Sequence, residues 1–136
     1  MWIYEQATGK LKDASGAVVA IGYSGRYPDG KNNPQAQDLE DVGPIPRGHY
    51  RIGAPVDTVT HGAYVLPLGP AVGNQMFGRV GFLIHGDSVF APGTASEGCV
   101  ILSRDIRKRL WASGDHDLEV VSGVMTAPDV DGEVAT

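Results

Sequence analysis

Short apolar runs separated by glycine and proline turns restrict the fold of this chain more than any other feature of its sequence. Residues 63–68 and 81–84 are such runs, residues 117–121 alternate between polar and apolar, and residues 2–6 are a further predicted strand; each segment has the length of a β-strand rather than that of a helix. The chain holds 19 glycines and 9 prolines in 136 residues, and both residue types favour turns. The pattern predicts a mainly β fold, either a sandwich or a partly closed barrel.

Further strands follow from the turn signals between the apolar runs. Residues 10–12, 17–23 and 49–52 are predicted strands, so the first two dozen residues form a β-meander. The polar segment 24–41 is predicted to be a long loop, and loops of this length in a compact domain are usually functional or mobile. Pro67 places the run that contains it at a sheet edge or at a bend.

One short helix and a single domain complete the predicted architecture. The helix is expected over 104–111, because Ser103 can cap its first turn and Gly114 can end it. A chain of this length buries one hydrophobic core, so residues 1–122 are predicted to form one domain. Residues 123–136 are acidic and lack apolar periodicity, so they are expected to be a disordered tail.

Charge and hydropathy argue against two kinds of partner. The net charge is −5 and no basic run is interleaved with aromatic residues, so binding to nucleic acid is not expected. No apolar stretch approaches the roughly 20 residues of a membrane span, so membrane insertion is not expected. The first ten residues lack the features of a secretory signal peptide, so synthesis in the cytoplasm without such a signal is expected.

The lone cysteine, Cys99, is the strongest candidate for chemistry. With one cysteine an intramolecular disulfide cannot form, so the thiol is either buried and inert or functional. Cys99 directly precedes the apolar run 100–102, and His85 directly follows the run 81–84. Each therefore lies at the end of a predicted strand, and pairing of the two strands would bring the thiol and the imidazole together.

A cysteine beside an imidazole is a typical nucleophile. A free thiol has a pKa of about 8.5, and a neighbouring imidazole activates it by taking its proton. Gly98 would let a substrate approach closely, and the backbone amides of Gly98 and Cys99 are suited to holding an oxyanion. The other histidines, His49, His61 and His116, lack the spacing of metal ligands, so neither a zinc site nor a cofactor is expected.

The motif around Cys99 resembles the signature of the YkuD-like L,D-transpeptidases. That signature is a histidine, a spacer, and then Ser/Thr-His-Gly-Cys with an apolar residue after it; here His85 precedes the Ser-Glu-Gly-Cys motif at 96–99. Glu97 stands where most members have a second histidine, and Ile101 stands where many have an arginine. The resemblance implies an L,D-transpeptidase-like fold with Cys99 as nucleophile and His85 as general base.

Further motifs are similar to one branch of this family, the L,D-transpeptidase-like effectors delivered by bacterial type VI secretion. The likeness covers roughly residues 2–122, and the Ser-Glu-Gly-Cys form of the motif is usual in this branch. It implies an antibacterial toxin that secretion machinery exports, that acts in the periplasm of a target bacterium, and that a cognate immunity protein neutralises. The motifs are Trp-x-Tyr-x-Gln-x-Thr-Gly at 2–9, Gly-Tyr-Ser-Gly at 22–25, Gly-Lys-Asn-Asn-Pro at 30–34, and Val-Gly-Pro-Ile-Pro-x-Gly-x-Tyr at 42–50.

The resemblance also implies an activity on the tetrapeptide stems of peptidoglycan. Cys99 would attack the carbonyl that follows the L-centre of diaminopimelate, release the terminal D-alanine and form a thioester. Water would then complete an L,D-carboxypeptidase reaction, whereas an amine acceptor such as a free D-amino acid would complete a transpeptidation. The sequence leaves the choice of acceptor open.

The residues around the cysteine and histidine have alternative interpretations. Ser96 either orients His85 or shapes the turn. Glu97 is either structural or in contact with substrate; if it points inward, a cation such as Arg104 or an amine of the substrate should pair with it. Asp87 either belongs to a turn or polarises His85 or binds substrate. The remaining candidates for substrate binding are Gly86, Tyr23 and Asn33, the last two with Lys31 and Asn32 in a loop that either covers the site or is simply solvated.

Two alternatives come from other functional classes. The missing second histidine and arginine favour a peptidoglycan-binding or structural module that keeps the fold without turnover, and an unreactive thiol would distinguish it. A cysteine peptidase acting on ordinary L,L-peptides is the third possibility, and it would cut casein-like peptides while leaving peptidoglycan tetrapeptides intact.

Overall fold

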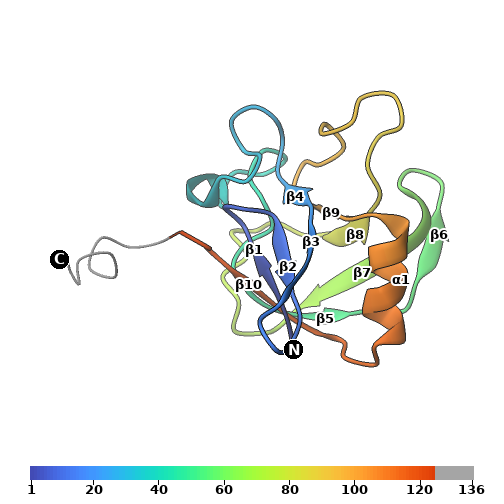
Figure 1. Ribbon diagram of the computed structural model, residues 1–136. Coiled ribbons are helices and arrows are strands. Elements are labelled where there is room, and N and C mark those ends of the chain that lie inside the picture. Colours follow the sequence, from blue (N-terminus) through green and yellow to red (C-terminus); the bar gives the residue numbers. More distant parts are fainter. Residues whose placement is uncertain (125–136) are drawn as a thin grey trace.

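The structure, a computed structural model, describes residues 1–124, which form ten strands, one α-helix and one 3₁₀ turn (Figure 1). The helix α1 (Arg104–Ala112) follows the ninth strand, and the 3₁₀ turn η1 (Pro34–Ala36) lies in the long loop before the fifth. The prediction of a mainly β fold with one short helix is thereby confirmed. The strands are β1 (Trp2–Glu5), β2 (Lys10–Lys12), β3 (Val18–Ile21), β4 (Tyr23–Ser24), β5 (Gly48–Ile52), β6 (Val56–Thr58), β7 (Gly62–Pro70), β8 (Leu83–His85), β9 (Val100–Ile101) and β10 (Asp117–Val121).

The strands join in one open sheet whose two ends meet. Its order is β3-β2-β1-β10-β5-β7-β8-β9-β4, and β6 pairs with β7 outside this path. Two pairs are parallel, β1 with β10 and β8 with β9, and the others are antiparallel. Gly22 alone separates β3 from β4, although these strands are the two ends of the order. The sheet therefore curls like a partly closed barrel.

Gly22 makes this corner possible. A Cβ atom at this position would lie 1.9 Å from the carbonyl oxygen of Ile101 in β9, so any side chain would collide with the neighbouring strand. The single strand predicted over 17–23 is wrong in this respect, because the chain breaks at Gly22 and its two halves belong to opposite ends of the sheet.

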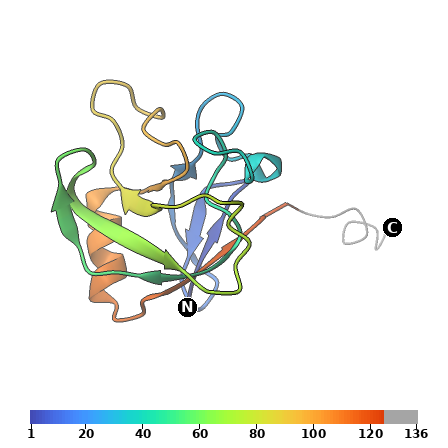
Figure 2. The same ribbon diagram turned by 180° about the vertical axis from the view of Figure 1, so that it is seen from behind.

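Alternating apolar side chains build the core. In β1 the buried residues Trp2 and Tyr4 alternate with half-buried ones, and in β10 Leu118 and Val120 do the same. The helix α1 packs against β7 and β8 (Figure 2) and buries Leu110 in the same core. Burial of these faces against one another stabilises the fold by the hydrophobic effect.

The predicted helix cap is confirmed, and the helix ends one residue later than predicted. The hydroxyl of Ser103 accepts a hydrogen bond from the amide of Ile106, and Ala112 is the last helical residue. The strand β6 was not predicted, because it has one apolar residue and therefore no hydrophobic alternation. Pro67 lies in β7, which pairs with β5 on one side and β8 on the other, so the edge is excluded of the two positions predicted for it, an edge or a bend.

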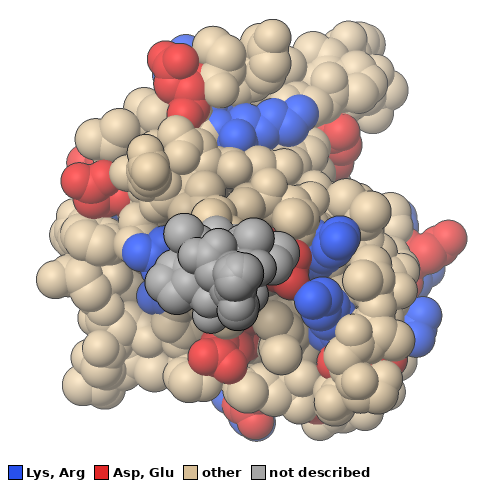
Figure 3. All heavy atoms as spheres, turned by 60° about the vertical axis from the view of Figure 1, so that its left-hand side comes forward, with Lys and Arg blue, Asp and Glu red and all other residues tan. Residues whose placement is uncertain are grey.

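Charged side chains of both signs are mixed over the visible surface. On the face drawn in Figure 3, Lys and Arg lie among Asp and Glu and do not form a continuous basic band over the visible part of residues 1–124. Among the helices of this described part, none has the length and apolarity needed to cross a membrane. Of the tail predicted over 123–136, residues 125–136 lie outside the described residues.

Candidate functional site

The strands β8 and β9 place His85 and Cys99 on the same face of the sheet. They pair in parallel with His85 opposite Ile101, so Cys99, two residues before Ile101, lies opposite Leu83. Residues two apart on a strand point to the same face of the sheet, so the imidazole and the thiol lie on one face as diagonal neighbours. From the usual spacing between strands and the rise per residue, their Cα atoms are about 8 Å apart. The predicted pairing of the two strands is confirmed.

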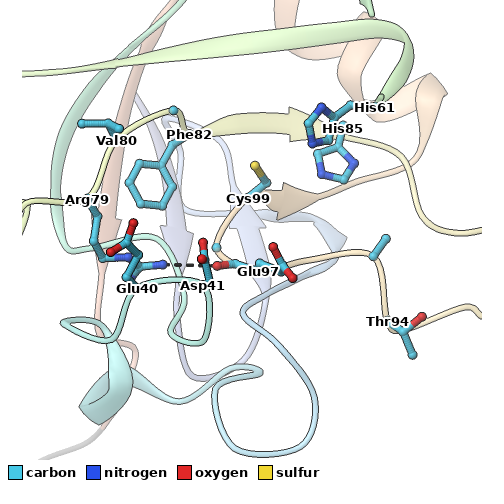
Figure 4. A pocket seen from close by; sticks show the side chains of 13 residues that line it. Glu40, Asp41, His61, Arg79, Val80, Phe82, His85, Thr94, Glu97 and Cys99 are labelled. Carbon is cyan, nitrogen blue, oxygen red and sulfur yellow. Dashed lines mark hydrogen bonds between the residues drawn. The ribbon is translucent and has the colours of Figure 1, made fainter. Parts of the chain in front are cut away.

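A cavity of about 330 Å³ opens beside the thiol (Figure 4). In this view the two imidazoles of His61 and His85 lie together on one side of Cys99. The carboxylates of Glu40, Asp41 and Glu97 lie below Cys99 in the same view. The residues that line the cavity are Glu40, Asp41, His61, Arg79, Val80, Gly81, Phe82, His85, Thr94, Ala95, Glu97, Gly98 and Cys99.

A second cavity of about 410 Å³ adjoins the first at the histidines. It shares His61, His85 and Ala95 with the first cavity, so the imidazole of His85 borders both. Its other lining residues are Thr60, Gly86, Asp87 and Ser88.

The imidazole of His85 is buried and held in one tautomer. Its Nδ1 lies 2.9 Å from the carbonyl oxygen of Gly86, and because a carbonyl only accepts, Nδ1 carries the proton. Nε2 is then unprotonated and able to take a proton. Burial is the main cause that lowers the pKa of His85, so the imidazole is neutral near pH 7.

The thiol of Cys99 rests in its protonated form. Burial is the main cause that raises the pKa of Cys99 above its ordinary value; the backbone of Leu83 and the charge of Arg79 oppose it, and the carboxylate of Glu97 adds a smaller effect in the raising direction. Within residues 1–124, no hydrogen bond joins this thiol to the imidazole of His85. The pair is therefore a neutral thiol and a neutral imidazole rather than a preformed ion pair.

Ser96 closes the turn that presents the cysteine. Its hydroxyl donates to the carbonyl of Cys99 at 2.5 Å and accepts from the amides of Gly25 and Gly98 at 2.9 and 3.1 Å. Ser96 thus shapes the turn, which was one of its two predicted roles, whereas the carbonyl of Gly86 is the group that orients His85.

Gly98 occupies a position that only glycine fits. Its φ of +147° lies in the region that side chains disfavour, and a Cβ atom would lie 2.6 Å from Nη2 of Arg79. Its carbonyl accepts from the hydroxyl of Ser24 at 2.8 Å. The amide of Gly98 donates to the hydroxyl of Ser96 within the turn. It is therefore already used there, whereas the sequence analysis expected it to bind an oxyanion.

Arg79 holds the turn against the loop that follows η1. This buried guanidinium donates to the carbonyls of Gln37, Gly43 and Pro44 at 2.6 to 2.9 Å and to that of Glu97 at 3.3 Å. Neutral acceptors of this kind satisfy the donors of a buried charge. The sequence did not identify Arg79, because nothing around it marks a buried arginine.

Asp87 and Tyr23 fasten the loop between β8 and β9. The hydroxyl of Tyr23 donates to Asp87 at 2.5 Å and accepts from the amide of Ala95 at 2.9 Å. Burial, followed by the hydrogen bond to Asp87, raises the pKa of Tyr23 to about 12, so this hydroxyl stays a donor. Lys31 lies over the Tyr23 ring and donates to the carbonyl of Gly93. Tyr23, which was a candidate for substrate binding, thus holds this loop in place.

Two further candidates are placed differently. Gly86 lines the second cavity, and its carbonyl fixes the His85 tautomer. Asn33 caps η1 through its side chain and donates to the carbonyl of Asp29, and it lines neither cavity. Asn33 therefore supports the loop rather than the cavity wall.

Residues distant in sequence complete the cavity. His61, from the turn between β6 and β7, lies with its ring centroid 4.8 Å from that of His85. Glu40 and Asp41 come from the loop after η1. Sequence reasoning missed these three as cavity residues, because a single histidine in a turn and acidic residues in a polar loop are common. Among the described residues, no group of three or more His, Cys, Asp or Glu side chains is arranged to hold a metal ion.

The fold and site together define a mainly β domain with a lone thiol and a buried imidazole facing one cavity. Residues 19–124 match the family model described as the Tlde1 domain, so the chain belongs to the Tlde1 domain family. The Tlde1 domain is a type VI secretion effector domain of the L,D-transpeptidase-like family with a peptidoglycan-targeting role. A comparison with curated proteins and one with solved structures each found no match.

Proposed function

We propose that the protein is a cysteine-dependent L,D-acyl transferase that acts on the tetrapeptide stems of peptidoglycan in the periplasm of a target bacterium. The observation that carries the proposal is the placement of Cys99 and His85 on one face of paired strands, lining one cavity, in a Tlde1 domain. The family also implies an immunity protein that protects the producing cell and secretion machinery that exports the effector.

In the proposed reaction His85 acts as the general base. Nε2 takes the thiol proton as Sγ of Cys99 attacks the carbonyl that follows the L-centre of diaminopimelate. The tetrahedral intermediate collapses when the imidazolium returns this proton to the amine of D-alanine, which leaves, and a thioester remains. Water, or the amine of a free D-amino acid, then attacks the thioester and restores the thiol.

The backbone geometry supports a specific oxyanion donor. The amide of Gly98 already donates to Ser96, so we assign the oxyanion to the amide of Cys99. The bonds of Ser96 and Ser24 to the ends of the Gly98–Cys99 unit hold this amide in place before substrate binds.

Mass spectrometry of purified tetrapeptide muropeptides tests the proposal. The wild type, Cys99→Ala, His85→Ala and the surface control His49→Ala are each incubated with the muropeptides, with and without D-methionine. Loss or exchange of the terminal D-alanine is expected with the wild type and the control only. Full activity of Cys99→Ala would remove the nucleophile from the proposal, and full activity of His85→Ala would remove the base.

A second candidate function is a peptidoglycan-binding module without turnover. The raised pKa of Cys99 favours it, as does the lack of a hydrogen bond from this thiol to His85 within residues 1–124. The rate of alkylation by iodoacetamide across pH separates the two. A rate that follows the titration of His85 supports the enzyme, whereas a rate that rises only above about pH 8.5, as for an unassisted thiol, supports the binding module.

A further inference from the structure

Arg107 is a buried arginine of α1 that makes no salt bridge within residues 1–124. Its guanidinium donates to backbone carbonyls instead. Nη1 donates to those of Ala63 and Tyr64 at 3.0 and 2.9 Å, and Nε donates to that of Ser103 at 3.4 Å. Burial of a charge without a carboxylate beside it is costly, so these contacts indicate a role beyond packing.

The strands β7 and β8 separate at the place where this guanidinium lies. They pair antiparallel, and Leu66 opposite Ile84 is the last pair toward the site. The same register carried two residues further would place Tyr64 opposite Gly86. That pair does not form, because Tyr64 has a φ of +56°, which interrupts the extended strand, and because β8 ends at His85.

The guanidinium of Arg107 fills the gap between the two strand ends. A Cβ atom at Gly86 would lie 3.0 Å from Nη2 and 3.7 Å from Cζ of Arg107, and outside the residues that flank Gly86 no atom of the described chain lies closer to that position. On the opposite side, the carbonyl of Tyr64 accepts from Nη1. Arg107 therefore takes the place of the missing pair.

We propose that Arg107 is a positioning residue for the His85 base, because it holds the Gly86 carbonyl that keeps the imidazole proton on Nδ1. Gly86 follows the last residue of β8, so none of the strand pairs within residues 1–124 includes it. Arg107 lines neither of the two cavities at the site, so it acts through Gly86 and not on the substrate. The inference rests on the proposed function, which takes His85 as the base.

The charge of Arg107 has a second effect on the imidazole. Burial is the main cause that lowers the pKa of His85; the carbonyl of Gly86 opposes it, and the charges of His61 and Arg107 act with it. A lowered pKa keeps the imidazole unprotonated at lower pH, so Arg107 helps to keep the base available there. The titratable and charged groups around this imidazole are His61 of the β6–β7 turn, Asp87 of the β8–β9 loop, Cys99 before β9 and Arg107 of α1.

NMR of the His85 ring nitrogens tests the positioning role without turnover. Spectra of ¹⁵N-labelled protein distinguish the protonated ring nitrogen from the unprotonated one. The wild type and the control Arg109→Met, at an exposed cation of the same helix, should keep one tautomer with the proton on Nδ1.

Two substitutions of Arg107 separate its geometry from its charge. Arg107→Lys keeps the charge but loses the planar fork of donors, whereas Arg107→Met loses both. Both variants should show a mixture of the two tautomers, and only Arg107→Met should raise the pKa of His85. The wild-type tautomer in Arg107→Lys would overturn the proposal, and this variant decides the matter even where Arg107→Met fails to fold.

Turnover of tetrapeptide muropeptides supplies the second arm of the test. In the folded variants kcat should fall by on the order of tenfold to a hundredfold through misplacement of the base, while KM stays close to that of the wild type. Wild-type kcat in the folded variants would reject the positioning role and keep the proposed function. Mixed tautomers in the variants, with no turnover even by the wild type, would keep the positioning of His85 and reject the proposed function.

Discussion

The imidazole ring of His61 lies beside that of His85, with ring centroids 4.8 Å apart and ring planes inclined by 52°. The two rings come from different elements, one from the turn between β6 and β7 and one from the end of β8. Burial is the main cause that lowers the pKa of His85, and the positive charges of His61 and Arg107 act in the same direction. The carbonyl of Gly86 and the carboxylate of Asp87 oppose them.

Replacing His61 with glutamine should raise the pKa of His85. The substitution removes a positive charge that lowers the pKa of the His85 imidazole, so the expected shift of that pKa is upward. NMR titration of the His85 ring nitrogens measures it directly. His49→Gln, an exposed histidine in β5, is the control and should leave the titration unchanged. An unchanged titration in His61→Gln would show that the two rings are not electrostatically coupled.

The burial of neutral His85 should make the fold less stable in mild acid. Its pKa is lowered in the folded state relative to about 6.5 in the unfolded chain, so the unfolded chain binds more protons below that value. The stabilisation is present above about pH 6.5 and is lost as the pH falls through the folded-state pKa. Urea unfolding of the wild type and of His85→Gln between pH 7 and pH 5 should show the steeper decline in the wild type. Parallel curves would contradict the assignment.

Gly98→Ala should damage both stability and thiol geometry. The alanine would hold an unfavourable φ of +147° and place its Cβ atom 2.6 Å from Arg79, so a cost of about 2–4 kcal/mol is expected. Gly16→Ala is the matched control, because Gly16 has a φ of +88° and open space around it, so about 1 kcal/mol should be lost there. Urea unfolding checks both. Equal losses would mean that the contact with Arg79 carries no cost.

Arg79→Met should destabilise the fold by about 2–4 kcal/mol, because buried carbonyl acceptors lose a charged donor. Arg51→Met is the control. Arg51 is exposed and forms a surface ion pair with Asp117, so its loss should cost less than about 1 kcal/mol. Thermal and urea unfolding provide the comparison, and similar values for the two variants would show that the carbonyl cage adds no stability.

Tyr23→Phe should loosen the loop between β8 and β9 while leaving the sheet intact. The phenylalanine keeps the ring but loses the bonds to Asp87 and to the amide of Ala95, so a global loss of only about 1 kcal/mol is expected. Hydrogen exchange at residues 88–95 should accelerate. Tyr27→Phe, at a tyrosine that is 65 % exposed, serves as the control. Unchanged exchange in Tyr23→Phe would assign the loop order to other contacts.

Local sequence signals predicted those parts of the fold that depend on short-range order. The alternation in β1 and β10 and the cap at Ser103 were visible because a residue and its near neighbours determine them. The break at Gly22 was not visible, since its cause is the close approach of Ile101, a residue far along the chain. The strand β6 was missed because its stability comes from pairing with β7 and not from an apolar pattern.

The residues of the site also fall into those that local sequence predicts and those that depend on tertiary packing. His85 and Cys99 were predictable because each lies next to an apolar strand and within a recognisable motif. The proximity of His61 to His85 and the carbonyl contacts of Arg79 depend on tertiary packing of separate loops. Ser96 shows the intermediate case, since the motif pointed to the residue while only the hydrogen bonds around it decided between its two roles.

The position of β10 between β1 and β5 affects the order in which the chain can assemble during synthesis. All residues that line the first cavity lie between Glu40 and Cys99, and a nascent polypeptide that has left the ribosome as far as Cys99 still lacks the strand that joins the two halves of its sheet. The pairing of Trp2 with Leu118 spans almost the whole described chain, and contacts of such high sequence separation form late in folding. The ribosome therefore has to deliver nearly all of this domain before its fold can close.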